Sequence, residues 1–198
     1  MTETMTTGPR VETRERLVNA AAQLFSQQGY AATGIKAVLA EAKAPYGSLY
    51  HYFPGGKQEL GSVAIAHGGA RYREVIESIY TVGGDVVEAT AESFREAARR
   101  LETTDYVEAC PVASIALEIA SSDQVIRAVA AEAFESWLHV LEDRFAAAGM
   151  SADKAREVAV EVFCLMEGSA LLARTTRSTT SVEIAGRTAT KVVANALG

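Results

Sequence analysis

Apolar residues recur at helical spacing along nearly the whole chain, and this periodicity constrains the fold more than any other feature of the sequence. Leu17, Ala21, Leu24 and Phe25 follow the i, i+4, i+7, i+8 pattern of an amphipathic helix. The alternation of apolar and polar residues that indicates strands is lacking. A chain of 198 residues with this pattern predicts an all-α fold.

Residues that cap or break helices divide the pattern into about nine helices. The first three lie within about 45 residues, and the last two of these are very short and joined by a small turn, which predicts a helix-turn-helix. The expected helices begin with one that is capped by Thr13 and stopped by Gly29, followed by 34–41 with Thr33 as its N-cap, 45–53 with Pro45 in its first turn, 57–82, 85–103, 111–121, 123–148, 151–176 and 180–197.

Charge divides the chain near the same place as the helix lengths. Residues 1–60 carry six Lys/Arg and five Asp/Glu, a net charge of +1, whereas residues 61–198 carry −7. The overall charge of −6 therefore describes the second part and does not exclude a nucleic-acid partner for the first. We expect a helix-turn-helix domain over residues 1–57 and a second helical domain over residues 58–198.

The segment 45–53 has an unusual composition for a short helix. Gly47 and Ser48 would let its backbone approach a DNA major groove, and the aromatic residues that follow offer donors to phosphates and faces to thymine methyl groups. Leu49 and Phe53 would anchor the helix to the core. Aromatic residues at helical spacing are also common packing residues, which is the competing interpretation. The predicted DNA-binding residues are Thr33, Lys36, Pro45, Tyr46, Gly47, Ser48, Tyr50, His51, Tyr52 and Lys57.

These residues in this order resemble the TetR family of bacterial repressors, whose recognition helix commonly reads S-K-G-T-L-Y-H-H-F. The resemblance covers about residues 12–60. The connection 53–57 and the stretch Ala109-Cys110-Pro111-Val112-Ala113, followed by Ala116-Leu117-Glu118, are similar to the LmrA/YxaF-like branch. The departures are Pro45 for a capping serine, Tyr46 for a basic residue, and Lys43 for a turn glycine that favours positive φ.

The resemblance implies a homodimer with a variable effector domain at the C-terminus. Small residues of the last two helices are then the expected dimer interface: Gly168, Ser169, Ala173, Ala185 and Ala189. Large apolar groups and a few polar ones on the long helices are either a helical core or the lining of a pocket for a small apolar or aromatic effector. The candidate pocket residues are His67, Phe94, Cys110, Trp137, Phe163, Met166 and Glu167.

Residues for catalysis or metal binding do not form a recognisable pattern. Glu135, His139 and Asp143 share one helix face, which is more typical of a solvated surface than of a metal site. Cys110 and Cys164 lie among apolar residues and are expected to be buried, inert thiols. We therefore expect no cofactor, no metal and no enzymatic activity. The N-terminal residues do not resemble a secretory signal and no apolar run is long enough to span a membrane, so a cytoplasmic protein of bacterial type is expected.

Together these features favour a transcriptional regulator that binds double-stranded operator DNA as a homodimer. The expected mechanism is that of a repressor, which leaves a pseudo-palindromic operator when a small apolar effector binds the second domain. Two alternatives stay open. One is a helical ligand carrier or small hydrolytic enzyme that uses the pocket, and the other is an activator or architectural DNA-binding protein.

Overall fold

A computed structural model describes residues 9–107, 110–119 and 121–198 of the chain. Within these ranges it contains nine helices and no strand, so the predicted all-α fold is confirmed. The helices are α1 (Pro9–Gln28), α2 (Ile35–Glu41), α3 (Ser48–Tyr52), α4 (Gly56–Ile79), α5 (Val86–Thr103), α6 (Ala113–Ile119), α7 (Gln124–Ala147), α8 (Ala152–Thr176) and α9 (Thr180–Leu197).

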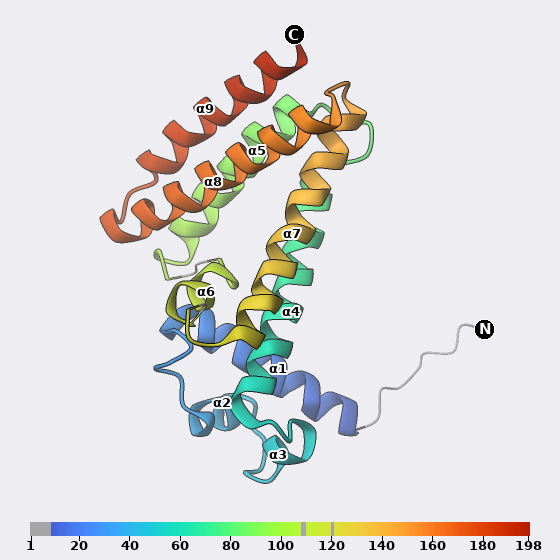
Figure 1. The fold of residues 1–198 in the computed structure, drawn as a ribbon. Coiled ribbons are helices and arrows are strands. Elements are labelled where there is room, and N and C mark those ends of the chain that lie inside the picture. Colours follow the sequence, from blue (N-terminus) through green and yellow to red (C-terminus); the bar gives the residue numbers. More distant parts are fainter. Residues whose placement is uncertain (1–8, 108–109, 120) are drawn as a thin grey trace, which may run out of the picture.

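The helices form two regions joined by a pair of long helices. Helices α1, α2 and α3 make up the lower end of the molecule in Figure 1, and we call this region the head. Helices α4 and α7 pack against each other and rise from the head to the upper part of the molecule. There α5, α8 and α9 pack together, while the short α6 lies between the head and this upper layer. None of the described helices is both long and apolar enough to cross a membrane.

Three predicted helix starts differ from the structure. Helix α1 begins at Pro9, so Thr13 lies within it. Gly34, not Thr33, occupies the N-cap of α2, and the Thr33 hydroxyl instead donates to the carbonyl of Gly29 at 2.7 Å. Pro45 begins a turn rather than a helix, because its carbonyl accepts the N–H of Ser48 at 2.9 Å and α3 starts only there. The other helix boundaries agree with the predictions to within about three residues.

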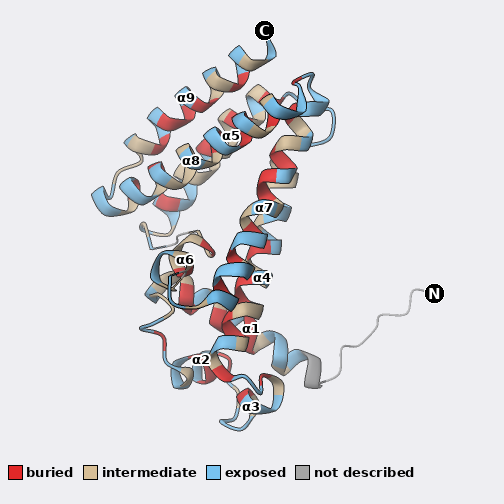
Figure 2. Cartoon of the chain, in the orientation of Figure 1, coloured by how far each residue is buried: buried red, intermediate tan, exposed pale blue. Residues whose placement is uncertain are grey.

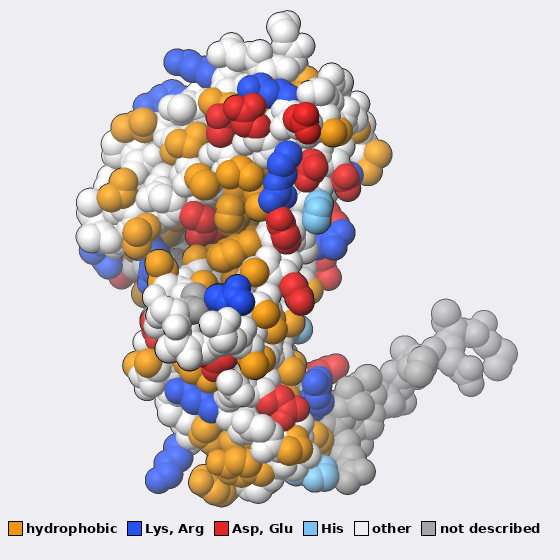
Figure 3. Space-filling view, viewed as in Figure 1, with side chains coloured by type: hydrophobic (Ala, Val, Ile, Leu, Met, Phe, Trp, Pro, Cys, Tyr) orange, Lys and Arg blue, Asp and Glu red, His pale blue; other side chains and the backbone are white. Residues whose placement is uncertain are grey.

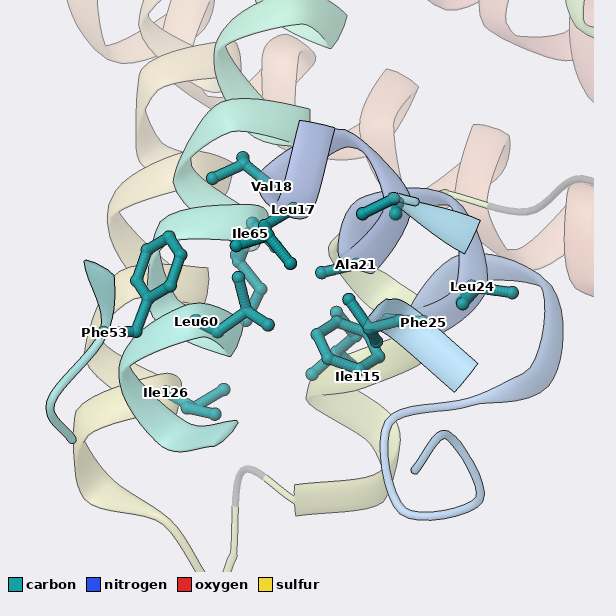
Figure 4. Packing of buried hydrophobic residues seen from close by; sticks show 14 of the residues in the cluster. Leu17, Val18, Ala21, Leu24, Phe25, Phe53, Leu60, Ile65, Ile115 and Ile126 are labelled. Carbon is teal, nitrogen blue, oxygen red and sulfur yellow. The ribbon is translucent and has the colours of Figure 1, made fainter. Parts of the chain in front are cut away.

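The core of the head continues into the long helices. The side chains of Leu17 and Phe25 from α1 and of Phe53 are fully buried, and they pack with residues of α4, α6 and α7 (Figure 4). Among these residues are Leu60 of α4, Ile115 of α6 and Ile126 of α7, and each is at most 1% exposed. The core of the head therefore includes residues of α4, α6 and α7, so these helices contact the head directly.

A second core holds the upper layer together. It contains buried residues of α5, α7, α8 and α9, visible as the red inner faces in Figure 2. Phe94 of α5 is 2% exposed there, and a side chain at Gly186 of α9 would approach its Cβ to 2.8 Å. Small residues therefore allow α5 and α9 to lie in close contact.

The turn between α2 and α3 has the backbone conformation that the sequence indicated. Lys43 adopts a φ of 49°, the left-handed region that glycine occupies without cost. Its neighbours close the turn, since Ala44 N–H donates to the carbonyl of Leu39 at 2.9 Å. The guanidinium of Arg16 donates to the carbonyl of Ala42 at 3.0 Å, which fixes the turn to α1.

Candidate nucleic-acid interface and internal cavity

Helix α3 is held by two apolar residues and presents its other residues to solvent. Leu49 and Phe53, four residues apart, are both fully buried, as their spacing predicted. Tyr50 is 57% exposed, and Tyr46, in the preceding turn, is 64% exposed. Exposed aromatic side chains of this size are uncommon on a surface that binds nothing. In Figure 3, hydrophobic side chains gather over the end of the molecule at which α2 and α3 lie.

The remaining predicted DNA contacts around α3 are divided between exposed and partly buried positions. Pro45, Gly47 and His51 are exposed, as is Lys36 on α2. The ring of Tyr52 is partly buried against the head core and lies 4.7 Å from the ring of His51 in an edge-on arrangement. Ser48 is also partly buried. The surface is therefore largely hydroxyl, imidazole and backbone, with basic groups at its margin.

Two other predicted contacts interact within the chain. Thr33 is 1% exposed, and its hydroxyl bonds carbonyls at the end of α1. Lys57 Nζ donates to the carbonyl of Ala31 at 3.4 Å and lies 4.5 Å from the centre of the Tyr30 ring. Burial lowers the pKa of Lys57, and the nearby Glu118 carboxylate opposes this effect. Lys57 thus reaches the α1–α2 connection in this structure.

A cavity of about 1230 Å³ lies between the head and the upper layer. Its walls come from α1, α4, α5, α6, α7 and α8 and from the segment before α6, so it touches both regions of the molecule. The apolar part of the wall includes Val75, Leu101, Phe134 and Met166. Hydrophobic side chains are visible on the face between the head and the upper helices in Figure 3. The volume is sufficient for a small organic molecule.

The predicted pocket residues fall into three groups. His67, Cys110, Met166 and Glu167 line the large cavity. Phe163 and again Met166 line a smaller space of about 70 Å³ between α4, α5, α7 and α8. Phe94 and Trp137 line neither: both are buried in the cores, and the Trp137 indole N–H donates to the Gly69 carbonyl at 2.8 Å.

The cavity wall contains polar groups with unused hydrogen-bonding capacity. The Glu167 carboxyl lies beside the Cys110 thiol, and burial raises the pKa of both groups. Burial also raises the pKa of the Tyr72 phenol. This group lies close enough to Cys110, Glu167 and Arg100 to interact with them electrostatically. His67 Nε2 is buried and has no partner among the described residues. A ligand with hydrogen-bonding groups could satisfy these side chains.

Sequence reasoning missed most of the cavity wall. The end of α1, including Gln27 and Gln28, lines it, as do three arginines: Arg71, Arg100 and Arg174. Nothing in the local sequence marks these residues, since their positions depend on how distant helices pack. Glu118 of α6 was also missed, although it belongs to the Ala116-Leu117-Glu118 stretch that the sequence singled out.

The small residues expected at a dimer interface are mostly inside the single chain. Ser169, Ala173, Ala185 and Ala189 are between 0% and 7% exposed, and only Gly168 faces outward. They allow α8 and α9 to pack closely, and the Ser181 hydroxyl also donates to the Ser169 carbonyl at 2.8 Å. The exposed apolar residues of these two helices are Val160, Leu171, Leu172, Ile184 and Leu197.

The structure also shows the surroundings of the candidate metal residue Glu135 and of the two cysteines. Glu135 forms an ion pair with Arg156 at 2.7 Å, and no group of His, Cys, Asp and Glu in the described part of the chain could hold a metal. Cys110 is partly buried at the cavity, but Cys164 is exposed, contrary to expectation. Val162 and Phe163 face inward on α8, and the helical turn of about 100° per residue directs Cys164 outward. Ala109 and residues 1–8 lie outside the described residues.

Two family models match separate parts of the chain. The model for bacterial regulatory proteins of the tetR family matches residues 17–61, which include α2, α3 and the end of α1. The model for the C-terminal domain of LmrA/YxaF-like transcriptional regulators matches residues 86–188. The second match covers the helices of the upper layer together with α6 and α7.

Proteins of known sequence and structure agree with these matches. The chain is 31% identical to the HTH-type regulator YxaF of Bacillus subtilis, over 86% of this chain and 90% of YxaF. It is also 31% identical to LmrA of the same organism, over 85% of this chain and 90% of LmrA. Its fold is similar to that of the regulatory protein TetR from Rhodobacter sphaeroides, with a TM-score of 0.80 and 21% identity over 90% and 97%. It is also similar to the fold of reduced E. coli NemR, with a TM-score of 0.78 and 20% identity over 90% of this chain and 95% of NemR.

Proposed function

The chain belongs to the TetR family of DNA-binding transcriptional regulators, in its LmrA/YxaF-like branch, and from this premise we propose that it is a ligand-responsive repressor. In this proposal the free protein binds a pseudo-palindromic operator, and a small organic effector in the cavity lowers its affinity for that operator. The observation that carries the proposal is the single cavity wall formed jointly by the head and the upper helices.

The proposed DNA-binding surface is the exposed side of α3 and the turn before it. Tyr46 and Tyr50 would contact phosphates or thymine methyl groups, and His51 would lie beside them. Gly47 has open space around it in the chain, so its backbone would be free to approach the groove. Thr33 would contribute by fixing the end of α1, because its hydroxyl bonds the carbonyls of Leu24 and Gly29.

The proposed dimer interface is the outward face of α8 and α9. Leu172 of α8 and Ile184 of α9 are exposed apolar residues of these helices, whereas Leu171 and Gly168 also line the cavity. A two-fold axis through this face would place two heads on one side of the dimer, as recognition of two half-sites requires. A contiguous apolar patch on a protein surface is typical of a site that packs against another protein.

The effector would act on the head from within the cavity. The cavity touches Gln27 and Gln28 of α1 as well as α4, which runs through both regions. A ligand that binds one arrangement of these helices better than another shifts the protein towards that arrangement. The proposed consequence is a change in head spacing and a loss of operator affinity. By linkage, operator DNA would weaken effector binding by the same factor.

A catalytic role is not part of the proposal. The relatives that match over most of the chain are transcriptional regulators. The polar groups at the cavity, Glu167 and Cys110, both have a raised pKa, which disfavours the thiolate that a nucleophilic cysteine needs.

Selection of bound DNA from a random pool tests the proposal. We expect an enriched site with two inverted half-sites about one helical turn apart, and elution of the protein from this site by a ligand of the cavity. Enrichment without inverted symmetry would contradict the dimeric repressor. A reporter fused to the selected site separates repression from activation, and turnover of a cavity ligand without DNA binding would favour the carrier or enzyme instead.

A further inference from the structure

The peptide group of Ala31, in the connection between α1 and α2, is held by a residue 87 positions away. The Oε2 atom of Glu118 on α6 accepts its N–H at 2.8 Å. Gly29 lies directly against the same carboxylate, with no space there for a side chain. A hydrogen bond to a charged acceptor is stronger than one between neutral groups. Glu118 thus fixes the α1–α2 connection to α6.

The backbone carbonyl of the same residue, which belongs to the next peptide group, is held from α4. Lys57 Nζ donates to the Ala31 carbonyl at 3.4 Å and lies 4.5 Å from the centre of the Tyr30 ring. The Glu118 carboxylate and the Lys57 ammonium are also close enough to interact electrostatically. The α1–α2 connection is therefore bonded by one acidic residue of α6 and one basic residue of α4.

Glu118 also belongs to the cavity wall. It lines the cavity together with Ala116 and Leu117 of the same short helix and with Gln28 and Gly29 at the end of α1. An occupant of the cavity would press on α6 and on α1 at the point where Glu118 joins them. Helix α6 has only seven residues and contacts α1 and α7, so it has few contacts to resist such a displacement.

We propose that Glu118 is a positioning residue that couples occupancy of the cavity to the α1–α2 connection and, through Ala31, to Lys57. Displacement of α6 moves the carboxylate, releases the Ala31 amide and alters the position of the Lys57 ammonium at the edge of the DNA-binding surface. The consequence for operator affinity rests on the proposed function, whereas the link between cavity and head does not. This role accounts for the acidic residue of the Ala116-Leu117-Glu118 stretch.

Amide hydrogen exchange of the full-length chain tests the contact without any DNA. Glu118→Ala should raise the exchange rate over residues 29–33 by about tenfold, because the Ala31 amide loses its acceptor. Glu118→Gln keeps an acceptor oxygen at the same place and should restore most of the protection. The control is Glu132→Ala, at an exposed α7 position without a hydrogen bond or ion pair in the described part of the chain, which should change nothing there. Unchanged exchange over residues 29–33 in Glu118→Ala would overturn the proposal.

A side chain built into the cavity tests the coupling without a known effector. Ala170 of α8 lines the cavity and is half-buried outside both cores, so Ala170→Trp places an indole in the space of a ligand. We expect this substitution to alter the exchange of residues 29–33 by at least about threefold in the wild-type background and not in the Glu118→Ala background. Ala128→Trp, at an exposed α7 position away from the cavity, is the matched control.

Two results would contradict the coupling. One is that Ala170→Trp leaves residues 29–33 unchanged, and the other is that its effect persists in full without Glu118. Operator affinity is then measured on the same variants at several salt concentrations, since a displaced Lys57 changes the salt dependence by about one phosphate contact. A chain that binds no operator would refute the proposed function, but the exchange data would still decide on Glu118.

Discussion

The indole N–H of Trp137 donates a hydrogen bond to the backbone carbonyl of Gly69 at 2.8 Å and so joins the two long helices α7 and α4 inside the core. Trp137 is fully buried, and the ring of Tyr72 lies 4.8 Å from its ring. Close approach is possible because Gly69 has no side chain: a Cβ there would come within 2.9 Å of Ala133. The helix that connects the head to the upper layer is therefore fixed to α7 at mid-length.

Trp137→Phe should lower the free energy of unfolding by about 1–3 kcal/mol, because it removes the buried indole N–H···O hydrogen bond and part of the buried ring surface. Chemical denaturation followed by circular dichroism measures this effect, since the variant contains no tryptophan. Tyr72→Phe is the matched control, because its hydroxyl has no hydrogen-bond partner among the described residues. An equal loss in both variants would show that packing, and not the Trp137 hydrogen bond, accounts for the effect.

Asp123 caps the N-terminus of α7 and also bonds α4. Its carboxylate accepts the N–H groups of Val125 and Ile126 and the side-chain amide of Gln58. Asp123→Ala should cost about 1 kcal/mol of stability, whereas Asp123→Asn, which can also cap a helix, should cost less.

The stabilisation by Asp123 should depend on pH. The Gln58 hydrogen bond, followed by the backbone N–H groups, lowers the pKa of this carboxyl, so its contribution is present at neutral pH and lost as the pH falls through the folded-state pKa. Thermal unfolding of wild type and Asp123→Ala between pH 7 and pH 3 should therefore show a difference that shrinks on acidification. A difference that is constant with pH would contradict this account.

Glu167 should destabilise the empty protein at neutral pH. Burial raises the pKa of its carboxyl above that of the unfolded chain, so the folded state is favoured by protonation and loses this advantage as the pH rises through the folded-state pKa. Glu167→Gln should therefore raise the melting temperature at pH 8 and change it little at pH 4. Thermal unfolding at both pH values measures this, and a larger stabilisation at pH 4 than at pH 8 would contradict it.

Lys43 stores a small strain in the turn of the helix-turn-helix. Its φ of 49° costs an L-residue roughly 1 kcal/mol relative to glycine, although glycine also loses more entropy on folding. Lys43→Gly should therefore stabilise the chain by about 0.5–1 kcal/mol in urea denaturation. Lys43→Ala removes the same charge but keeps the strained conformation and should not stabilise; equal stabilisation by both variants would assign the effect to charge.

The sequence predicted the helices well because their signals are local. Helical periodicity and the stop at Gly29 act over a few residues, and even the positive φ of Lys43 could be anticipated from its place in the turn. Thr33 was predicted as a cap because it precedes a helix, but its hydroxyl finds acceptors on α1 instead. A choice between two such partners depends on tertiary packing.

The cavity and the surfaces of the upper layer could be predicted less well for the same reason. Large apolar residues such as Phe94 and Trp137 are equally suited to a core or to a pocket, and the packing of α5 and α7 places both in the cores. The amide of Ala31 meets Glu118 only because α6 folds against the end of α1. Contacts across such distances leave no periodic signal in the sequence.

Operator binding by variants of the α3 surface tests the central claim most directly. Tyr46 and Tyr50 are more than half exposed, so Tyr46→Ala and Tyr50→Ala should leave the melting temperature nearly unchanged. In a mobility-shift titration with the selected operator, the account predicts that each loses about tenfold or more in affinity, while Val82→Ala, at an exposed position between α4 and α5, binds like wild type. Wild-type affinity in both tyrosine variants would contradict the assignment of this surface to DNA.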